Sequence, residues 1–231
     1  MFRYMLGGGD LPSYVIGILL SLPIVFLSLS VHETAHGYAA YRLGDPTARN
    51  LGRLTLNPLK HLDPVGFVCM LLAGFGWANP VPINSRYFRK PRRDIALVGV
   101  AGPLSNLLLA VVFLLLLRFV GFGWLATLTF ETELQFNLAY FTVLFLYYGV
   151  YMNVTLAVFN LLPVPPLDGS RIFYVFLPPR LYYKVMRHER TIVLVVMALL
   201  LLGPLSALID LFSSLIVKGL FSLVGMSGFL I

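Results

Sequence analysis

Long apolar runs alternate with short polar segments along this chain. The first run covers residues 11–43, and two further full runs cover about 95–119 and 134–159. The C-terminal region holds another apolar run, 191–209, followed by a shorter apolar tail. Runs of about 20 apolar residues are typical of helices that cross a bilayer. The pattern therefore predicts an α-helical polytopic membrane protein with about five to six membrane-embedded helices.

Two segments between the first and second full runs do not fit that pattern. Residues 47–57 alternate polar and apolar side chains around Gly52, which predicts a small β-hairpin. Residues 65–78 are apolar, but as a helix they would be only about 21 Å long at about 1.5 Å per residue. The hydrocarbon core is about 30 Å thick. We therefore expect residues 65–78 to be re-entrant, entering the bilayer and returning to the same side.

Composition and charge support a membrane location. Of the 231 residues, 58% are hydrophobic and 12% are charged, whereas a soluble domain usually carries about 25% charged residues. The formal net charge is +7, and the basic residues cluster at 42–60, 86–93 and 171–190. Lys and Arg in short loops tend to stay in the cytoplasm. We therefore expect these segments on the cytoplasmic side of the cell membrane, with the lipid bilayer and not nucleic acid as the partner.

The sequence "HETAH" at the end of the first run carries the clearest chemistry. On a helix, His32 and His36 project from one face, so both imidazoles can reach a single metal ion. Glu33 is then placed to act as a general base on water at that metal. Zinc fits because catalytic zinc sites use three protein ligands plus water. The alternative is a pair of buried histidines bonded to backbone, but ionisable groups within a membrane mark functional sites by default.

A third ligand is needed, and Asp168 in "NLLPVPPLDG" is the best candidate. It is the only acidic residue between Glu133 and Glu189. It follows a proline-broken turn, and such irregular backbone is tolerated at membrane depth where it lines a cavity or is buried in protein. From residue type alone, a metal ligand and an N-cap for a helix over residues 170–176 are equally good interpretations of Asp168.

A few other polar residues lie in or near the apolar runs. For Asn106 and Asn153 we expect hydrogen bonds between helices. His61 and His188 fall in basic loops, where we expect them to be solvated or at the membrane interface. Cys69 is the only cysteine, which excludes an intrachain disulfide and a thiolate zinc site.

Two separated motifs, "HETAH" at the end of one span and "NLLPVPPLDG" after a later one, resemble those of the site-2 protease family of intramembrane zinc metalloproteases, peptidase family M50. The stretches "GDPTA", "ANPVPIN" and "AGPLSNLLLA" are similar to its short prokaryotic members. The resemblance implies that His32, His36 and Asp168 bind one Zn²⁺ per chain and that Glu33 is the catalytic base. It also implies that Asn160 holds the substrate or the developing oxyanion.

The resemblance covers about residues 20–175 and implies a function. Family members cut transmembrane segments of membrane-anchored proteins, so we expect a multi-pass enzyme whose active site opens toward the cytoplasm. We expect one membrane-embedded domain over residues 1–231, with a catalytic core at about 12–175, C-terminal helices at about 176–231, and no PDZ or CBS domain. The alternative is a non-catalytic zinc-binding membrane protein or an inactive homologue that binds membrane partners. Neither interpretation defines the oligomeric state.

Overall fold

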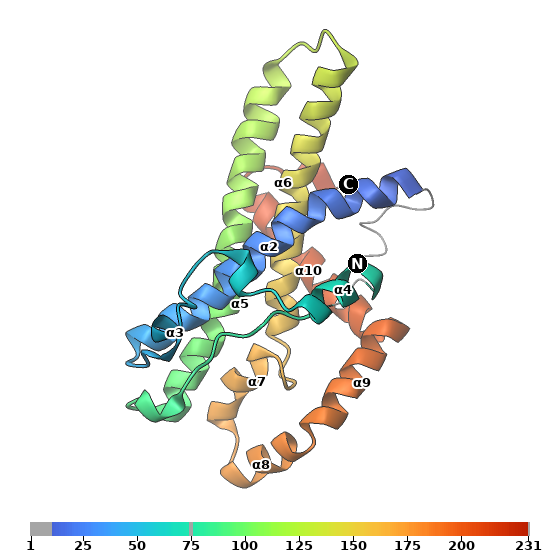
Figure 1. Cartoon of the computed structure of the whole chain (residues 1–231). Coiled ribbons are helices and arrows are strands. Elements are labelled where there is room, and N and C mark those ends of the chain that lie inside the picture. Colours follow the sequence, from blue (N-terminus) through green and yellow to red (C-terminus); the bar gives the residue numbers. More distant parts are fainter. Residues whose placement is uncertain (1–10, 74–75, 231) are drawn as a thin grey trace.

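The computed structural model describes residues 11–73 and 76–230, and most of these residues are helical (Figure 1). Four helices in this part of the chain are long and apolar enough to cross a membrane. They are α2 (Leu11–Arg42), α5 (Pro91–Leu116) with its continuation to Thr127, α6 (Glu133–Asn160) and α10 (Pro204–Leu223). The helical polytopic architecture is confirmed, whereas a count of five to six membrane-embedded helices is not.

Shorter helical segments connect these spans. The α-helices are α3 (Thr47–Asn50), α4 (Pro64–Ala73), α7 (Asp168–Phe173), α8 (Pro179–Arg187) and α9 (Glu189–Leu202). Beyond α5 lies a π-helical segment, Leu117–Trp124, and the 3-10 turns are Pro58–Lys60, Ser85–Tyr87, Leu125–Thr127, Tyr174–Phe176 and Ser227–Leu230. In Figure 1, α7 and α8 lie at the end of the bundle where α6 ends and α5 begins.

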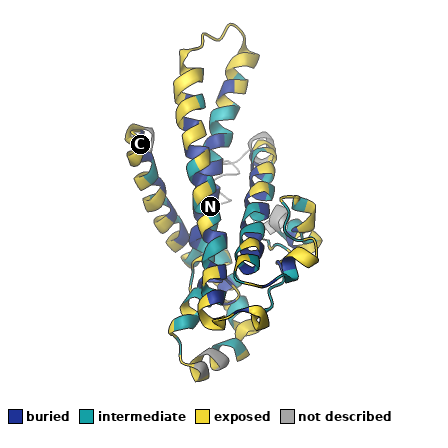
Figure 2. Ribbon diagram, turned by 90° about the vertical axis from the view of Figure 1, so that its left-hand side faces the viewer, coloured by how far each residue is buried: buried dark blue, intermediate teal, exposed yellow. Residues whose placement is uncertain are grey.

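The main core lies where α5, α6 and α10 meet. Its buried members include Phe113 and Leu114 from α5, Val150 and Val154 from α6, and Val217 and Phe221 from α10. The outer faces of the same helices are exposed (Figure 2). They are also apolar, with Leu108 61% exposed and Leu138 68% exposed. Helices that are apolar all round belong in a large core or a bilayer. The bundle therefore presents a surface suited to lipid.

The β-hairpin predicted over residues 47–57 is wrong. Thr47–Asn50 forms a helical turn, and no β-strand occurs in 11–73 or 76–230. The carboxylate of Asp45 explains the difference, because its Oδ1 accepts hydrogen bonds from the backbone N–H of Thr47 at 2.9 Å and from the Thr47 hydroxyl. Such local bonds favour a turn over strand pairing. Gly52 ends the turn with a φ of +65°.

The segment predicted to be re-entrant contains the short helix α4, which has 10 residues. An isolated antiparallel bridge joins Leu62 to Ala78, and the N–H of Asn79 donates to the carbonyl oxygen of His61 at 2.8 Å. The two ends of the segment therefore lie side by side. A segment that enters and leaves the bilayer on one side needs this arrangement, and its depth in the membrane stays a prediction.

The C-terminal span differs from the predicted run 191–209. Gly203 ends α9 with a left-handed φ of +103°, and Pro204 is the first residue of α10. Glycine after a helix and proline at the first position of the next are strong stop and start signals. The spanning helix is therefore α10, and Asp210 lies inside it.

The close approach of α5 and α6 at Gly149 gives a test of this packing. A Cβ at Gly149 would lie 2.3 Å from Cδ1 of Phe113. We expect Gly149→Ala to lower the free energy of unfolding by about 1–3 kcal/mol through overpacking. The measurement is the thermal melting temperature of the protein in detergent.

Gly219→Ala on α10 is the matched control, because no atom lies within 4 Å of a Cβ at Gly219. This variant should keep or raise the melting temperature, since alanine has the higher helix propensity. Identical melting of the two variants would show that α5 and α6 do not pack as described.

Candidate metal centre

The motif histidines lie on the part of α2 that packs against α5. His32 and His36 are 5% and 4% exposed, and Glu33 between them is 9% exposed. The two imidazole centroids are 4.6 Å apart on consecutive turns. The helix therefore brings both rings to one face, as the i, i+4 spacing predicts.

Asp168 completes a group of three, although it lies 132 positions after His36. Its Oδ2 is 3.1 Å from His32 Nε2 and 3.0 Å from His36 Nε2, and the two Nε2 atoms are 3.0 Å apart. In the described part of the chain, these are the His, Cys, Asp or Glu side chains that gather closely enough to hold a metal ion. Asp168 is the first residue of α7 and does not cap it, so the N-cap interpretation is not what the structure shows.

The hydrogen bond made by Nδ1 of each imidazole determines whether Nε2, the nitrogen that faces Asp168, carries a lone pair or a proton. His36 Nδ1–H donates to the carbonyl oxygen of Val98 at 2.7 Å, and His32 Nδ1–H donates to Asn106 Oδ1 at 2.9 Å. A neutral imidazole protonated at Nδ1 carries a lone pair on Nε2. Both Nε2 atoms and the Asp168 carboxylate therefore direct lone pairs toward one point, as metal coordination requires.

The size of this group fits zinc. Ligand atoms held tetrahedrally at about 2.0–2.1 Å from zinc lie about 3.3–3.4 Å from one another. The three atoms here are 3.0–3.1 Å apart, so a shift of a few tenths of an ångström suffices. Gly102 on α5 keeps the neighbouring space clear, because a Cβ there would lie 2.4 Å from His36 Nε2 and 2.6 Å from His32 Nε2.

The proline-broken turn after α6 delivers Asp168 to this group. A Cβ at Gly169 would lie 2.3 Å from the carbonyl oxygens of both Leu161 and Leu162. Only glycine lets the start of α7 pack so closely against the end of α6. The peptide bond between Pro165 and Pro166 is cis, and the turn returns the chain toward α2.

The carboxylate of Asp168 is held in its charged form. Burial alone would raise its pKa, but when no cation is bound, a proton carried on Nε2 of His32 or His36 and donated to the carboxylate holds the pKa below its usual range. The Arg171 guanidinium lies on the other side, with Nη1 3.7 Å from Asp168 Oδ1. One carboxylate oxygen therefore faces the imidazoles and the other faces a cation.

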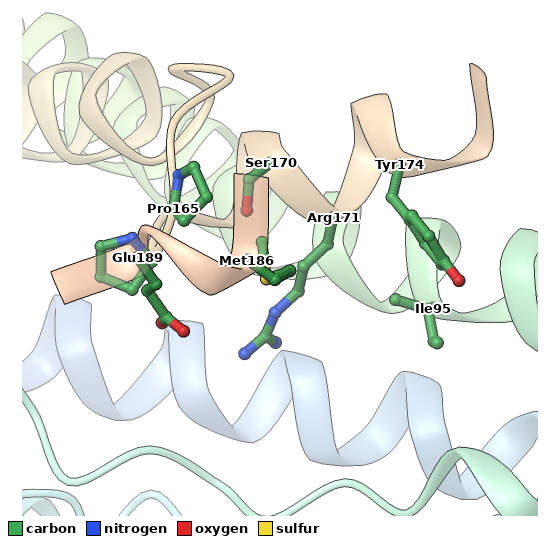
Figure 3. Close-up of a pocket in the computed structure, with 8 residues that line it drawn as sticks. Ile95, Pro165, Ser170, Arg171, Tyr174, Met186 and Glu189 are labelled. Atoms are coloured by element: carbon green, nitrogen blue, oxygen red, sulfur yellow. The ribbon is translucent and has the colours of Figure 1, made fainter. Parts of the chain in front are cut away.

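Arg171 also lines a cavity of about 200 Å³ beside this turn (Figure 3). The cavity lies between the start of α5, the proline turn, α7 and the α8–α9 region. Its lining combines charged and apolar side chains, among them Ile95, Tyr174, Met186 and Glu189. It thus adjoins the candidate metal centre through Arg171, which lines the cavity and faces Asp168.

The third motif residue, Glu33, contacts the segment "ANPVPIN". Its Oε2 accepts a hydrogen bond from the backbone N–H of Val81 at 2.9 Å. Arg53 holds the same segment in place, because its Nη2 donates to the carbonyl oxygen of Asn79 at 2.7 Å. One oxygen of the Glu33 carboxylate is therefore fixed, which leaves Oε1 to accept a proton.

Asn160 is the last residue of α6 and is hydrogen-bonded within that helix. Its Nδ2 donates to the carbonyl oxygen of Leu156 in the same helix at 2.9 Å. This contact neither joins Asn160 to the three converging side chains nor tests a role with substrate. That role stays a prediction.

The expectations for the other polar residues are partly confirmed. Asn106 does bond between helices, and its partner is His32. The same expectation for Asn153 is wrong, because its Nδ2 donates to Gly149 O within α6 at 2.8 Å. The prediction that His61 is solvated or interfacial is also wrong, since it is 1% exposed.

Sequence reasoning missed the face of α5 that supports the histidines. Val98, Gly102 and Asn106 follow one another at four-residue intervals, opposite His32 and His36 at the same interval on α2. The backbone carbonyl of Val98, the Gly102 residue without a side chain and the side-chain amide of Asn106 therefore lie in a row that faces the imidazoles. The spacing was visible in the sequence, but nothing in it indicated which helix this face would meet.

A buried cluster of two histidines and an aspartate inside a bundle of apolar helices is typical of a metal site in a membrane-embedded metalloprotein. Sequence comparison specifies the class further, because residues 21–204 match Peptidase family M50. The chain belongs to peptidase family M50, the site-2 protease family, and is a zinc metalloprotease.

Individual relatives agree with this family. YwhC of Bacillus subtilis, named as a candidate zinc metalloprotease, is 46% identical over 166 residues, which are 71% of this chain and 72% of YwhC. Rip2 of Mycolicibacterium smegmatis, named likewise, is 33% identical over 162 residues, which are 68% of this chain and 57% of Rip2. Zinc metalloprotease MJ0392 of Methanocaldococcus jannaschii is 24% identical over 69% of this chain and 35% of that protein. No solved structure matches the chain significantly.

Removing the carboxylate of Asp168 tests whether this residue is a ligand in the candidate metal centre. We expect Asp168→Ala to weaken zinc binding at least about 100-fold, because losing even an outer hydrogen-bond partner of a ligand costs about 10–100-fold. The measurement is zinc per chain in purified protein after dialysis against a chelator. Glu131→Ala, at an exposed acid before α6, is the control and should keep full zinc. Full zinc in Asp168→Ala would remove Asp168 from the ligand set.

Proposed function

We propose that this chain is an intramembrane endopeptidase that hydrolyses peptide bonds within or near transmembrane segments of membrane-anchored proteins. The position of the candidate metal centre carries the proposal, because its histidines are buried on α2, a helix able to span a membrane. His36 lies six residues before the end of α2 at Arg42, or about 9 Å at about 1.5 Å per residue. A substrate in the plane of the bilayer could meet a site at that depth.

His32, His36 and Asp168 hold one zinc ion in this proposal, and Glu33 is the general base. Bound zinc would supply Lewis acidity toward a water molecule and toward the carbonyl of the bond to be cut. Glu33 accepts the proton of the attacking water on Oε1 and passes it to the departing amine. The Val81 N–H holds Oε2, so the carboxylate is oriented before the reaction begins.

Asn160 is proposed to bind the extended substrate. A transmembrane helix satisfies its carbonyls internally, so it must unwind locally before a peptide bond becomes accessible. Freed backbone N–H and C=O groups then need partners. An asparagine amide offers both a donor and an acceptor, and Asn160 stands at the start of the turn that carries Asp168. Its present bond to Leu156 O would be exchanged for one to substrate.

The cavity beside Arg171 offers room for a substrate side chain next to the cut bond. Its volume is about 200 Å³, larger than any single side chain. Walls that combine apolar side chains with polar ones, among them one cation and one anion, suit a residue at the boundary between a transmembrane segment and its polar flank.

Charge distribution supports a site that opens toward the cytoplasm. The basic segments 42–60, 86–93 and 171–190 follow α2, precede α5 and include α8. In Figure 1, α3, the start of α5 and α8 all lie in the lower part of the molecule. Because short basic loops tend to stay cytoplasmic, that part is proposed to face the cytoplasm.

A non-catalytic role is favoured by one observation, the hydrogen bond between Glu33 and Val81. A carboxylate that only anchored a loop would make the same contact. Glu33→Gln separates the two functions, because a glutamine oxygen still accepts from Val81 N–H but the amide cannot take up a proton.

We expect Glu33→Gln to lower the rate of cleavage of a single-span model substrate by about 10²–10⁴-fold, the usual contribution of a general base. Zinc per chain and the melting temperature should stay at wild-type values, since no ligand and no anchoring contact is lost. Cleavage at the wild-type rate would exclude Glu33 as the base. Zinc-loaded wild-type protein that cleaves no membrane substrate would favour the non-catalytic function.

A second substitution tests the substrate role of Asn160. We expect Asn160→Ala to lower kcat about 10²-fold, as loss of an oxyanion donor does, with zinc unchanged. Asn137→Ala near the other end of α6 is the matched control and should retain wild-type kcat. If Asn160 only stabilises the end of α6, Asn160→Ala will show a lower melting temperature with normal kcat.

A further inference from the structure

We infer that Asn106 is a positioning residue for zinc, which acts by fixing the tautomer and the direction of the His32 imidazole. The inference rests on the proposed function in one respect, that His32 is a zinc ligand. Asn106 is 1% exposed on α5, and its Oδ1 lies 2.9 Å from His32 Nδ1 on α2. The bond joins two candidate spans directly behind the candidate metal centre.

The direction of this hydrogen bond decides whether His32 can bind a metal. An asparagine amide can accept at Oδ1 or donate from Nδ2. Donation from Nδ2 would require a lone pair on His32 Nδ1 and would move the ring proton to Nε2. That proton would point at His36 Nε2 and Asp168 Oδ2, 3.0 and 3.1 Å away, and would exclude a cation. Acceptance at Oδ1 instead leaves the Nε2 lone pair free.

Within the described part of the chain, the other end of the amide has no competing hydrogen bond. Asn106 Nδ2 is buried and has no hydrogen-bond partner among the residues of 11–73 and 76–230. Buried polar atoms are nearly always paired in folded proteins. Among the described residues, the contact of Oδ1 with His32 is therefore the hydrogen bond that holds this side chain.

The contrast with His36 explains why a side chain is needed here. The carbonyl oxygen of Val98 accepts the Nδ1 proton of His36 at 2.7 Å, and no substitution removes a backbone carbonyl. Eight residues further along the same face of α5, an amide side chain does the equivalent work for His32. Gly102 between them leaves space for both rings. One face of α5 thus orients both imidazoles. Of its two hydrogen-bond acceptors, the side chain of Asn106 is the one that a substitution can remove.

The experiment measures zinc affinity, by competition with a chelator of known affinity, for the full chain purified in detergent. We expect Asn106→Leu, which fills similar space without an acceptor, to bind zinc about 10–100-fold more weakly. Asn106→Asp should bind within about threefold of wild type or more tightly, because a carboxylate accepts the same proton and raises the basicity of the ring. The melting temperature of each metal-free variant is recorded alongside.

Asn153→Leu is the matched control, since Asn153 is a fully buried asparagine on α6 whose hydrogen bond, within the described part of the chain, is to Gly149 O of its own helix. It should keep wild-type zinc affinity even if it melts earlier. Wild-type affinity in Asn106→Leu would overturn the inference. So would an equal loss in Asn153→Leu, or a loss in Asn106→Asp as large as in Asn106→Leu. If Asn106→Leu does not fold, the affinity of Asn106→Asp decides alone.

These outcomes are distinct from failure of the proposed function. A wild-type chain that binds no zinc would end the assignment of His32, His36 and Asp168 as ligands. A wild-type chain that binds zinc and cleaves substrate, beside an Asn106→Leu variant of equal affinity, would end only the role of Asn106.

Discussion

Three lone pairs brought together in an apolar environment are the constraint on which this structure depends. The Nε2 atoms of His32 and His36 and a carboxylate oxygen of Asp168 lie within 3.1 Å of one another. Such atoms repel unless protons or a cation lie between them, and burial strengthens that repulsion. The protein is therefore built to receive a positive charge at this point, and the surrounding helices serve to hold the atoms there.

Helix α5 is the support against which the group is assembled. Its face contributes a backbone carbonyl to His36, an amide oxygen to His32 and, between them, the empty space at Gly102. Helix α6 packs on another side of α5 and carries the chain back to the proline turn. That turn ends in Asp168. Helix α5 therefore orients the imidazoles directly, and by packing against α6 it also fixes the position of the Asp168 carboxylate.

A second set of contacts, along the loop before α5, places the proposed base. The chain from α3 to α5 has no strand among its described residues, yet polar groups hold it firmly. Asp45 accepts from the backbone of Thr47 and of Asn84, at 2.9 and 2.6 Å. Val81 N–H is thereby positioned to hold Glu33. An irregular segment held by buried side-chain partners thus provides the backbone group that contacts Glu33.

The sequence by itself determined the features that depend on local order. Apolar periodicity gave the spans around α2, α5 and α6, and residue type with helical spacing gave His32 and His36 as a pair. It also selected Asp168 as a candidate, but it could not choose between ligand and cap, because that choice depends on a partner 132 positions away. The hairpin and the last span were misjudged where a local side chain, Asp45, or a Gly-Pro pair outweighed the broader pattern.

Only the tertiary structure decided which groups meet. The partner of Asn106, the clearance at Gly102 and the contact of Glu33 with Val81 all arise where segments far apart in the chain come together. Hydrogen bonds and steric contacts act over a few ångströms in space, whatever the sequence separation of the residues that make them. The sequence pattern can therefore identify the side chains able to bind a metal. The packing of α2 on α5 determines the orientation of the imidazoles.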